Sequence, residues 1–217
     1  MISDITQQQL NHLHVAPDKP LVICDVDEVI VHFIQDFEHY LGQRDLALTP
    51  AHPSQPYAIR HLASGDATTT AETHALVDQF FEIHTRSMKP IIGAVKGLKA
   101  LGDHASIIML TNLPHFAGDD RRENLKGFGL HFPVITNSGP KGPAISNLAA
   151  RTSRPVAFID DSPSFVQSAF EHAPHVHIVH FMHDERFSAF VPPLDFVSLR
   201  TNHWKHIERH VLKLVAG

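Results

Sequence analysis

Five short apolar runs along the chain have the length and composition of buried strands. They cover residues 21–24, 105–110, 134–136, 156–159 and 176–181. Apolar runs of this length, rich in β-branched residues and bounded by polar ones, are typical of strands covered on both faces. The sequence therefore predicts a sheet whose strands are buried on both sides.

Between and around these runs, apolar residues recur every three or four positions. This spacing predicts helices over residues 3–14, 92–101, 119–128, 143–150, 164–171 and 199–215. Strands that alternate with helices indicate parallel βαβ units with helices on both faces of the sheet. We therefore expect an α/β protein with a Rossmann-like parallel sheet.

Residues 33–88 interrupt this alternation. Helical spacing of aromatic residues begins at Phe33, and residues 73–88 carry an apolar stripe at Leu76, Phe80 and Ile83. Three prolines between the two helical stretches are expected to break regular structure. We interpret 33–88 as a small, mostly helical insertion, which leaves 1–32 and 89–217 as the core domain.

Composition excludes several classes of protein. Hydrophobic residues make up 43% of the 217 positions, which is typical of a globular core. The net charge is -5 and the chain has no stripe of lysine and arginine, so we expect no nucleic-acid polymer as partner. No apolar run reaches the roughly 18 residues of a membrane span, and the first residues lack a signal-peptide pattern. With a single cysteine, these features favour a cytoplasmic protein without membrane association. The sequence does not indicate the oligomeric state.

The chain has 19 histidines, many of them in its last third. Eight of them form two groups: His172, His175, His177, His180 and His183, then His203, His206 and His210. A zinc or copper site is one interpretation. No cysteine or carboxylate joins either group at a familiar ligand spacing, so a histidine-rich surface is the favoured one.

The first apolar run ends in two aspartates, Asp25 and Asp27, separated by one residue. In an open α/β sheet, ligands bind at the carboxyl ends of the strands. Two carboxylates this close repel each other unless a cation or a shared proton intervenes. The pair predicts a divalent-metal site at which one carboxylate is free to act as a nucleophile.

Three later segments carry polar residues at matching positions. Thr111 and Asn112 follow the second run, Lys141 begins a predicted helix, and Asp160 and Asp161 follow the fourth run. Hydroxyl, amide and ammonium groups can bind an anionic phosphate, and adjacent acids favour a cation. Taken singly, each could instead be a helix cap, a turn residue or a solvated surface side chain.

The order of these motifs resembles that of the haloacid dehalogenase-like (HAD) hydrolase superfamily over about residues 20–183. The resemblance implies a Rossmann-like core with its motif loops at one sheet edge and a cap inserted at 33–88. It implies that Asp25 is the nucleophile and that Asp27 is the general acid and base, which also offers its main-chain carbonyl to the metal. The residue after Asp27 is Glu28, where many relatives have glycine and others glutamate.

The same resemblance assigns the remaining site residues. Asp160 is implied as a direct ligand of magnesium (Mg2+), with Asp161 as a supporting one. Thr111 and Lys141 are implied to bind the phosphate, and Asn112 to add contacts to it. The chain is thus expected to hydrolyse phosphoric monoesters of a small metabolite through an aspartyl-phosphate.

Several alternatives stay open at this point. The first motif, the small cap and the Asp-Asp pair are also similar to deoxyribonucleotidase-like members, which implies a 5'-nucleotidase-like substrate range. A phosphomutase and a catalytically silent regulator with the same fold are further alternatives. In the cap, the aromatic residues could stack on a ring or form the cap core, and Arg44, Arg60 and Arg86 could bind a second phosphate.

Overall fold

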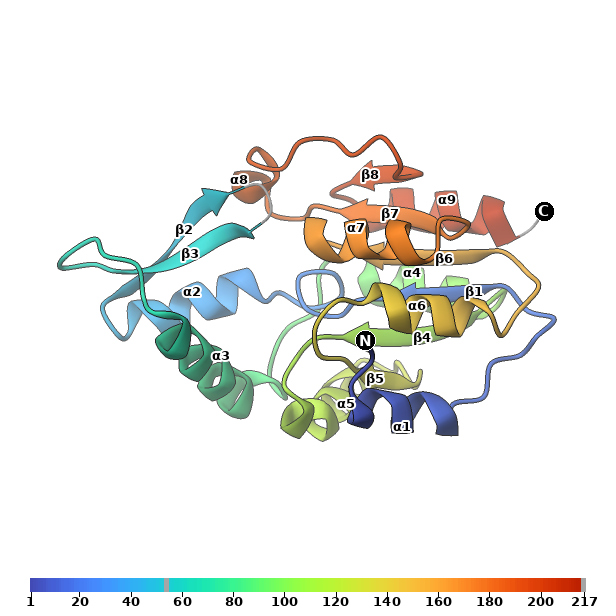
Figure 1. Ribbon diagram of the computed structural model, residues 1–217, viewed down its shortest axis with the longest axis horizontal. Coiled ribbons are helices and arrows are strands. Elements are labelled where there is room, and N and C mark those ends of the chain that lie inside the picture. The colour runs from blue at the N-terminus through green and yellow to red at the C-terminus, as the bar shows by residue number, and fades with distance from the viewer. Residues whose placement is uncertain (53–54, 216–217) are drawn as a thin grey trace.

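The computed structural model describes residues 1–52 and 55–215, and a six-stranded sheet forms its centre (Figure 1). The strand order is β5-β4-β1-β6-β7-β8, and every neighbouring pair is parallel. The strands are β1 Leu21–Cys24, β4 Ser106–Thr111, β5 Val134–Thr136, β6 Val156–Asp160, β7 His177–Phe181 and β8 Leu199–Thr201. The predicted Rossmann-like α/β architecture is confirmed.

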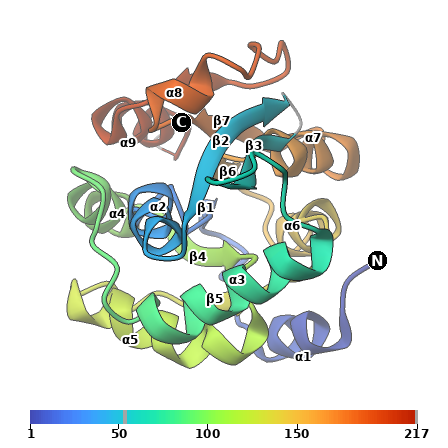
Figure 2. The same ribbon diagram turned by 90° about the vertical axis from the view of Figure 1, so that its left-hand side faces the viewer.

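Helices cover both faces of this sheet, as Figure 2 shows. On one face lie α4 Ala94–Gly102, α5 Gly118–Gly127 and α9 Trp204–Val215, and on the other lie α1 Asp4–His12, α6 Gly142–Ala149 and α7 Pro163–His172. Short η1 His115–Ala117 and α8 Glu185–Ser188 complete this part. The predicted helices are present with their ends shifted by a few residues.

Strand β1 shows how the pattern produces the fold. Val22 and Cys24 pack into the apolar cluster on one face, and Leu21 and Ile23 pack into the cluster on the other. All four side chains are fully buried, and burial of an aliphatic side chain contributes about 1.5–3 kcal/mol. Because β1 lies between β4 and β6, the residue that follows it, Asp25, lies at the middle of the sheet edge.

The inserted segment lies beyond that edge of the sheet. It consists of α2 Ile34–Gly42, the antiparallel hairpin β2 Leu46–His52 and β3 Gln55–His61, and α3 Thr70–His84 (Figure 1). The two helices were predicted, but Pro50 and Pro56 do not prevent regular structure between them: Pro50 pairs with Tyr57 in the hairpin and Pro56 lies in β3. Pro53, the third proline expected to break regular structure, lies outside the described residues. A two-stranded ribbon has only edge strands, where a missing N–H donor is tolerated.

Aromatic rings from α2 and α3 form the interior of the inserted segment. The ring of Phe37 lies 5.1 Å from that of Phe80, and the ring of Tyr40 lies 5.6 Å from that of Phe80. Tyr40 and Phe80 are 1% and 0% exposed, so they are core residues of this segment. Ile83, expected on the same apolar stripe, is instead 60% exposed.

The end of the chain differs from its prediction as a single helix over 199–215. Residues Leu199–Thr201 form β8, and only Trp204–Val215 are helical. A three-residue strand is too short to establish an alternating pattern, and its parallel pairing with β7 decides its conformation. The indole of Trp204 donates a 2.8 Å hydrogen bond to the carbonyl of Val29, which fixes α9 to the loop after β1.

Within residues 1–52 and 55–215, each helix falls short of the length and apolarity that crossing a bilayer requires.

Candidate active site

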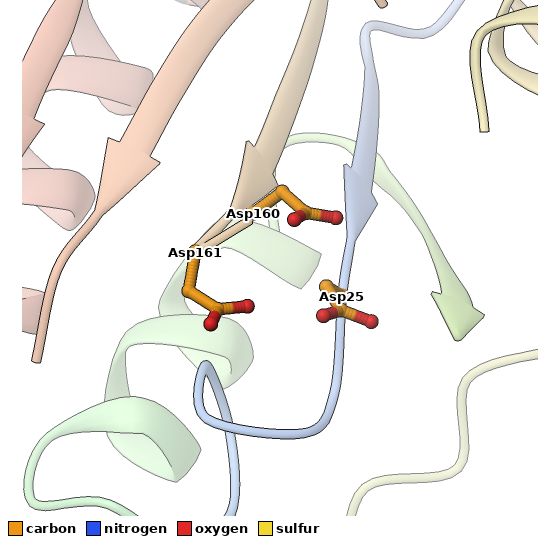
Figure 3. Close-up of side chains that lie close together, drawn as sticks. All are labelled: Asp25, Asp160 and Asp161. Carbon is orange, nitrogen blue, oxygen red and sulfur yellow. The ribbon is translucent and has the colours of Figure 1, made fainter. Parts of the chain in front are cut away.

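Three carboxylates converge where β1 and β6 end. Asp25 follows β1, Asp160 is the last residue of β6, and Asp161 is the next residue along the chain. Each offers an oxygen that lies within 4.8 Å of those of the other two, and the carboxyl groups face a common space (Figure 3). Asp25 is 5% exposed and Asp160 is fully buried. Parallel neighbouring strands thus bring together residues that are 135 positions apart in the chain.

Lys141 lies between two of these carboxylates. Its Nζ atom is 2.7 Å from Asp25 Oδ1 and 2.7 Å from Asp160 Oδ2. Burial by itself would lower the pKa of Lys141, but the charges of Asp160 and Asp25 outweigh burial and raise the pKa above its usual value. Lys141 is therefore an ammonium ion, as its predicted contact with phosphate requires.

Close packing of α6 against α7 fixes Lys141 in this place. A Cβ atom at the next residue, Gly142, would lie 2.2 Å from the carbonyl oxygen of Ser168. The Gly142 N–H donates instead to Ser168 Oγ at 3.1 Å. Glycine at 142 therefore permits the helix contact that positions the lysine.

The acidic cluster fits a hard divalent cation. Lys141 pairs with Asp25 and Asp160, and its single positive charge leaves an excess of negative charge on the three carboxylates. Burial raises the pKa of Asp160, partly offset by Lys141, and burial together with the charges of Asp160 and Asp25 raises the pKa of Asp161. A cation with oxygen ligands, such as magnesium, would relieve this repulsion, and Asp25, Asp160 and Asp161 are the side chains that could hold it.

Asp27 belongs to a second charged pair, with Arg121. Its Oδ2 accepts a 3.1 Å hydrogen bond from the hydroxyl of Thr111, and its Oδ1 accepts one from Nη2 of Arg121. Burial raises the pKa of Asp27, and the charge of Arg121 opposes that rise. A carboxyl with a raised pKa keeps its proton to a higher pH, which suits proton donation. The main-chain role predicted for Asp27 at the metal stays a prediction.

Arg121 is a site residue that the sequence analysis missed. Its side chain is fully buried, and it donates to Asn124 Oδ1 at 3.1 Å as well as to Asp27. Asn124 in turn donates to the carbonyl of Met88 at 2.9 Å, at the end of the inserted segment. Arg121, Asn124 and Leu125 share the buried side of α5. Arg121 lies four residues before Leu125, so a search for charged residues at helical spacing from buried apolar ones would have identified it.

Asn112 connects two loops of the site. Its Nδ2 donates to the carbonyl of Gly139 at 2.8 Å, and its Oδ1 accepts from Nδ2 of Asn137 at 3.0 Å. These bonds join the end of β4 to the loop that leads to Lys141. The hydroxyl of Thr111 is directed to Asp27, so the predicted phosphate contacts of Thr111 and Asn112 stay predictions.

Glu28 connects the site loop to the inserted segment. Its φ is 60°, in the left-handed region, and its Oε2 accepts from the N–H groups of Phe33 and Ile34 at 3.1 and 2.8 Å. These N–H groups begin α2, whose N-cap residue forms no side-chain cap. Burial raises the pKa of Glu28 to about 7. Glu28 therefore caps α2 at the expense of an unfavourable backbone conformation.

Comparing Glu28→Ala with Glu28→Gly separates these two effects. Both variants lose the cap, and the buried N–H groups left without an acceptor should lower the free energy of unfolding by about 1–3 kcal/mol. Glycine also removes the left-handed strain, so Glu28→Gly should be more stable than Glu28→Ala by about 1 kcal/mol. Urea denaturation measures both differences. Equal stabilities for the two variants would contradict the strained conformation.

A cavity of about 670 Å³ opens beside the acidic cluster. It extends from Asp25 and Asp27 under the inserted segment, and α2, the hairpin, α3 and Phe165 of α7 contribute to its walls. The arginines considered as binders of a second phosphate lie elsewhere. Arg44 stacks on Tyr40, Arg60 donates to the carbonyl of Gly65, and Arg86 pairs with Asp120. The cavity is large enough for a small metabolite.

The histidine groups do not gather into a metal site in the part of the chain that the structure describes. There, the acidic cluster is the only set of three or more potential ligands. His180 is buried and its Nε2 is 3.0 Å from the carbonyl oxygen of Asp161, and His206 contacts the hydroxyl of Thr201. These histidines have structural contacts of their own, and no geometry here favours the zinc or copper interpretation.

Comparisons with known proteins agree on the fold. No family model and no curated protein matches the sequence. A HAD-family hydrolase from Deinococcus radiodurans, solved with bound phosphate and sodium, is 13% identical with a TM-score of 0.60, covering 92% of this chain and 97% of that one. A protein from Lactobacillus plantarum described as a candidate phosphoglycolate phosphatase is 12% identical with a TM-score of 0.57, covering 89% and 99%. A HAD hydrolase from Bacillus subtilis, solved with magnesium, is 11% identical with a TM-score of 0.52, covering 90% and 99%. The chain therefore has the HAD-like fold.

Proposed function

We propose that this chain, with its HAD-like fold, is a magnesium-dependent phosphoric monoester hydrolase that acts through an aspartyl-phosphate on a small phosphorylated metabolite. One observation carries the proposal: Asp25, Asp160 and Asp161 converge beside a cavity, and Lys141 pairs with Asp25 and Asp160. A nucleophilic carboxylate, a phosphate-binding ammonium and oxygen ligands for a cation are the parts that phosphoryl transfer needs.

Similar proteins support the proposal. The Deinococcus structure holds phosphate, the Bacillus structure holds magnesium, and the Lactobacillus protein is described as a phosphatase. Asp27 favours a phosphatase over a halide-displacing enzyme, because a halide leaves without a proton. We also propose that residues 33–88 act as a cap over a core of 1–32 and 89–217, since this segment forms the part of the cavity wall that faces the core.

In the first step, a carboxylate oxygen of Asp25 attacks phosphorus, forming an O–P bond as the bond to the leaving oxygen breaks. Asp27 gives its proton to that oxygen, so the leaving group departs as a neutral alcohol. Thr111 and Arg121 hold the Asp27 carboxyl in place for this transfer. Lys141 neutralises part of the charge on the transferred group.

In the second step, Asp27 is ionised and acts as a base. It removes a proton from a water molecule, whose oxygen attacks phosphorus of the aspartyl-phosphate. The O–P bond to Asp25 breaks, which releases inorganic phosphate and restores the carboxylate. Magnesium, when bound by Asp25, Asp160 and Asp161, would supply positive charge that offsets repulsion between the nucleophile and an anionic substrate.

Metal removal tests the proposed function. Acetyl phosphate is a suitable probe, because its small leaving group places few demands on the cavity. Purified protein should release inorganic phosphate with added magnesium, and chelation by EDTA should reduce the rate to background and be reversed by excess magnesium. Undiminished hydrolysis after exhaustive chelation would contradict a metal-dependent reaction.

Arg121→Met tests the assignment of Arg121 as the residue that positions Asp27. Without its partner, the Asp27 carboxyl loses its orientation, so kcat on an alkyl phosphate should fall about 10–100-fold, below the 10²–10⁴-fold of Asp27→Asn. Without the charge of Arg121, the pKa of Asp27 should rise further, so the alkaline limb of the kcat profile should move to higher pH.

The matched control is Arg122→Met, one residue along α5. Arg122 pairs with the exposed Asp119 at 2.6 Å and has no contact with Asp27. Its removal should leave kcat and the pH profile as they are. An alkaline limb that does not move in Arg121→Met would contradict the positioning role, because a purely structural defect lowers the rate without shifting the profile.

A further inference from the structure

We infer that the leaving group of the substrate is an uncharged alcohol that carries an aromatic ring. This inference rests on the proposed function, and it concerns the cavity beside the acidic cluster. Three properties of the cavity wall carry it: the side chains that form its apolar part, the sign of its charged groups, and the place of its hydroxyl groups.

Aromatic and aliphatic side chains form much of the wall. Phe33, Phe37 and Phe81 come from the inserted segment, with Ile59 and Val77 beside them. The ring of Phe33 is stacked on those of Phe37 and Phe81 at 5.1 and 5.6 Å. These rings already support one another, so they offer a rigid apolar surface to a ligand without a large loss of side-chain entropy.

The wall carries acidic side chains but neither lysine nor arginine among the described residues. Asp25, Asp27, Glu28 and Asp161 line the cavity, whereas no lysine or arginine does so among the residues that the structure describes. The four positions outside 1–52 and 55–215 are Pro, Ser, Ala and Gly, which add no lysine or arginine. A carboxylate or second phosphate on the leaving group would lose water without gaining a lysine or arginine as partner on the wall.

Hydroxyl and imidazole groups line the part of the wall that α3 and the segment before it provide. These are the hydroxyls of Thr68, Thr70 and Thr73 and the imidazole of His74. They can hydrogen-bond to hydroxyl or ring-nitrogen groups of a ligand. Since polar groups in an apolar pocket fix orientation, the cavity suits an aromatic ring with neutral polar substituents.

A set of three synthetic esters tests the inference. Phenethyl phosphate and para-carboxyphenethyl phosphate have the same phenethyl group next to the phosphate and differ only in a carboxylate on the far side of the ring. Ethyl phosphate lacks the ring. With magnesium, kcat/KM for phenethyl phosphate should exceed that of each of the other two esters by about tenfold or more. The carboxylated ester is disfavoured because its carboxylate is repelled by the acidic wall, and ethyl phosphate is disfavoured because it lacks the apolar contact of the ring.

His74→Arg should change this selectivity in a defined direction. A permanent positive charge on the cavity wall would favour the carboxylated ester, so the ratio of phenethyl to para-carboxyphenethyl kcat/KM should fall several-fold. His104→Arg makes the same substitution at an exposed residue between α4 and β4, outside the cavity, and should leave the ratio unchanged.

The outcomes separate the inference from the proposed function. Hydrolysis of acetyl phosphate with equal or better turnover of the carboxylated ester or of ethyl phosphate would overturn the inference and leave the phosphatase standing. An unchanged ratio of phenethyl to para-carboxyphenethyl kcat/KM in His74→Arg would also overturn the inference, because the leaving group would then not contact this cavity wall. Failure to hydrolyse acetyl phosphate or any ester would overturn both.

Discussion

Asp25→Asn should abolish phosphate release from acetyl phosphate, with a loss of about 10⁴-fold or more. The amide oxygen of asparagine is a poor nucleophile, and removal of a covalent nucleophile typically costs a large part of the rate enhancement. The measurement is kcat under saturating magnesium. Turnover within tenfold of the wild-type value would contradict the covalent step.

The fold should survive this substitution. The Asp25→Asn variant loses one ionic contact with Lys141 but also lacks one of three mutually repelling carboxylates, so we expect the free energy of unfolding to change by about 1 kcal/mol or less. Asp18→Asn, at an exposed aspartate before β1, is the matched control and should keep full activity.

A second measurement identifies Asp25 as the phosphorylated residue. In Asp27→Asn the water-activating base is missing, so the second step should be slower than the first when acetyl phosphate is the donor. Radiolabelled acetyl phosphate should then leave acid-stable label on the protein, and the label should be absent from the Asp25→Asn, Asp27→Asn double variant. Label that persists in the double variant would place the covalent step on another residue.

Lys141→Met should impair both stability and activity. Its ammonium is fully buried between Asp25 and Asp160, and removal of one partner of a buried ion pair costs about 3–5 kcal/mol because the other charges stay unpaired. The same ammonium stabilises the transferred phosphoryl group, so kcat should fall about 10²–10³-fold. Urea denaturation without metal and steady-state kinetics with magnesium measure the two effects.

The double variant Lys141→Met, Asp160→Asn separates the effect on stability from the effect on activity. Removing one of the unpaired carboxylates should restore much of the lost stability, whereas activity should stay low because neither the ammonium nor the metal ligand returns. Lys126→Met is the control, since Lys126 forms an exposed pair with Glu123 on α5 and should change neither quantity appreciably. A Lys141→Met protein as stable as wild type without metal would contradict the buried ion triad.

Sequence alone determined the core of this protein. Leu21–Cys24 and the later apolar runs have no polar face, and only a sheet covered on both sides buries such strands. The polar residues that follow these runs were identified for the same reason: parallel strands end at a common edge, so Asp25, Thr111 and Asp160 had to lie near one another.

Tertiary contacts decided the rest. Pro50 lies in a strand because an isolated hairpin tolerates it, and Leu199–Thr201 is a strand because β7 offers a partner. Glu28 takes a left-handed conformation to cap α2, and Arg121 is buried because Asp27 balances its charge. Local sequence patterns record burial and spacing along the chain, whereas these four features depend on partners that only the folded chain brings into contact.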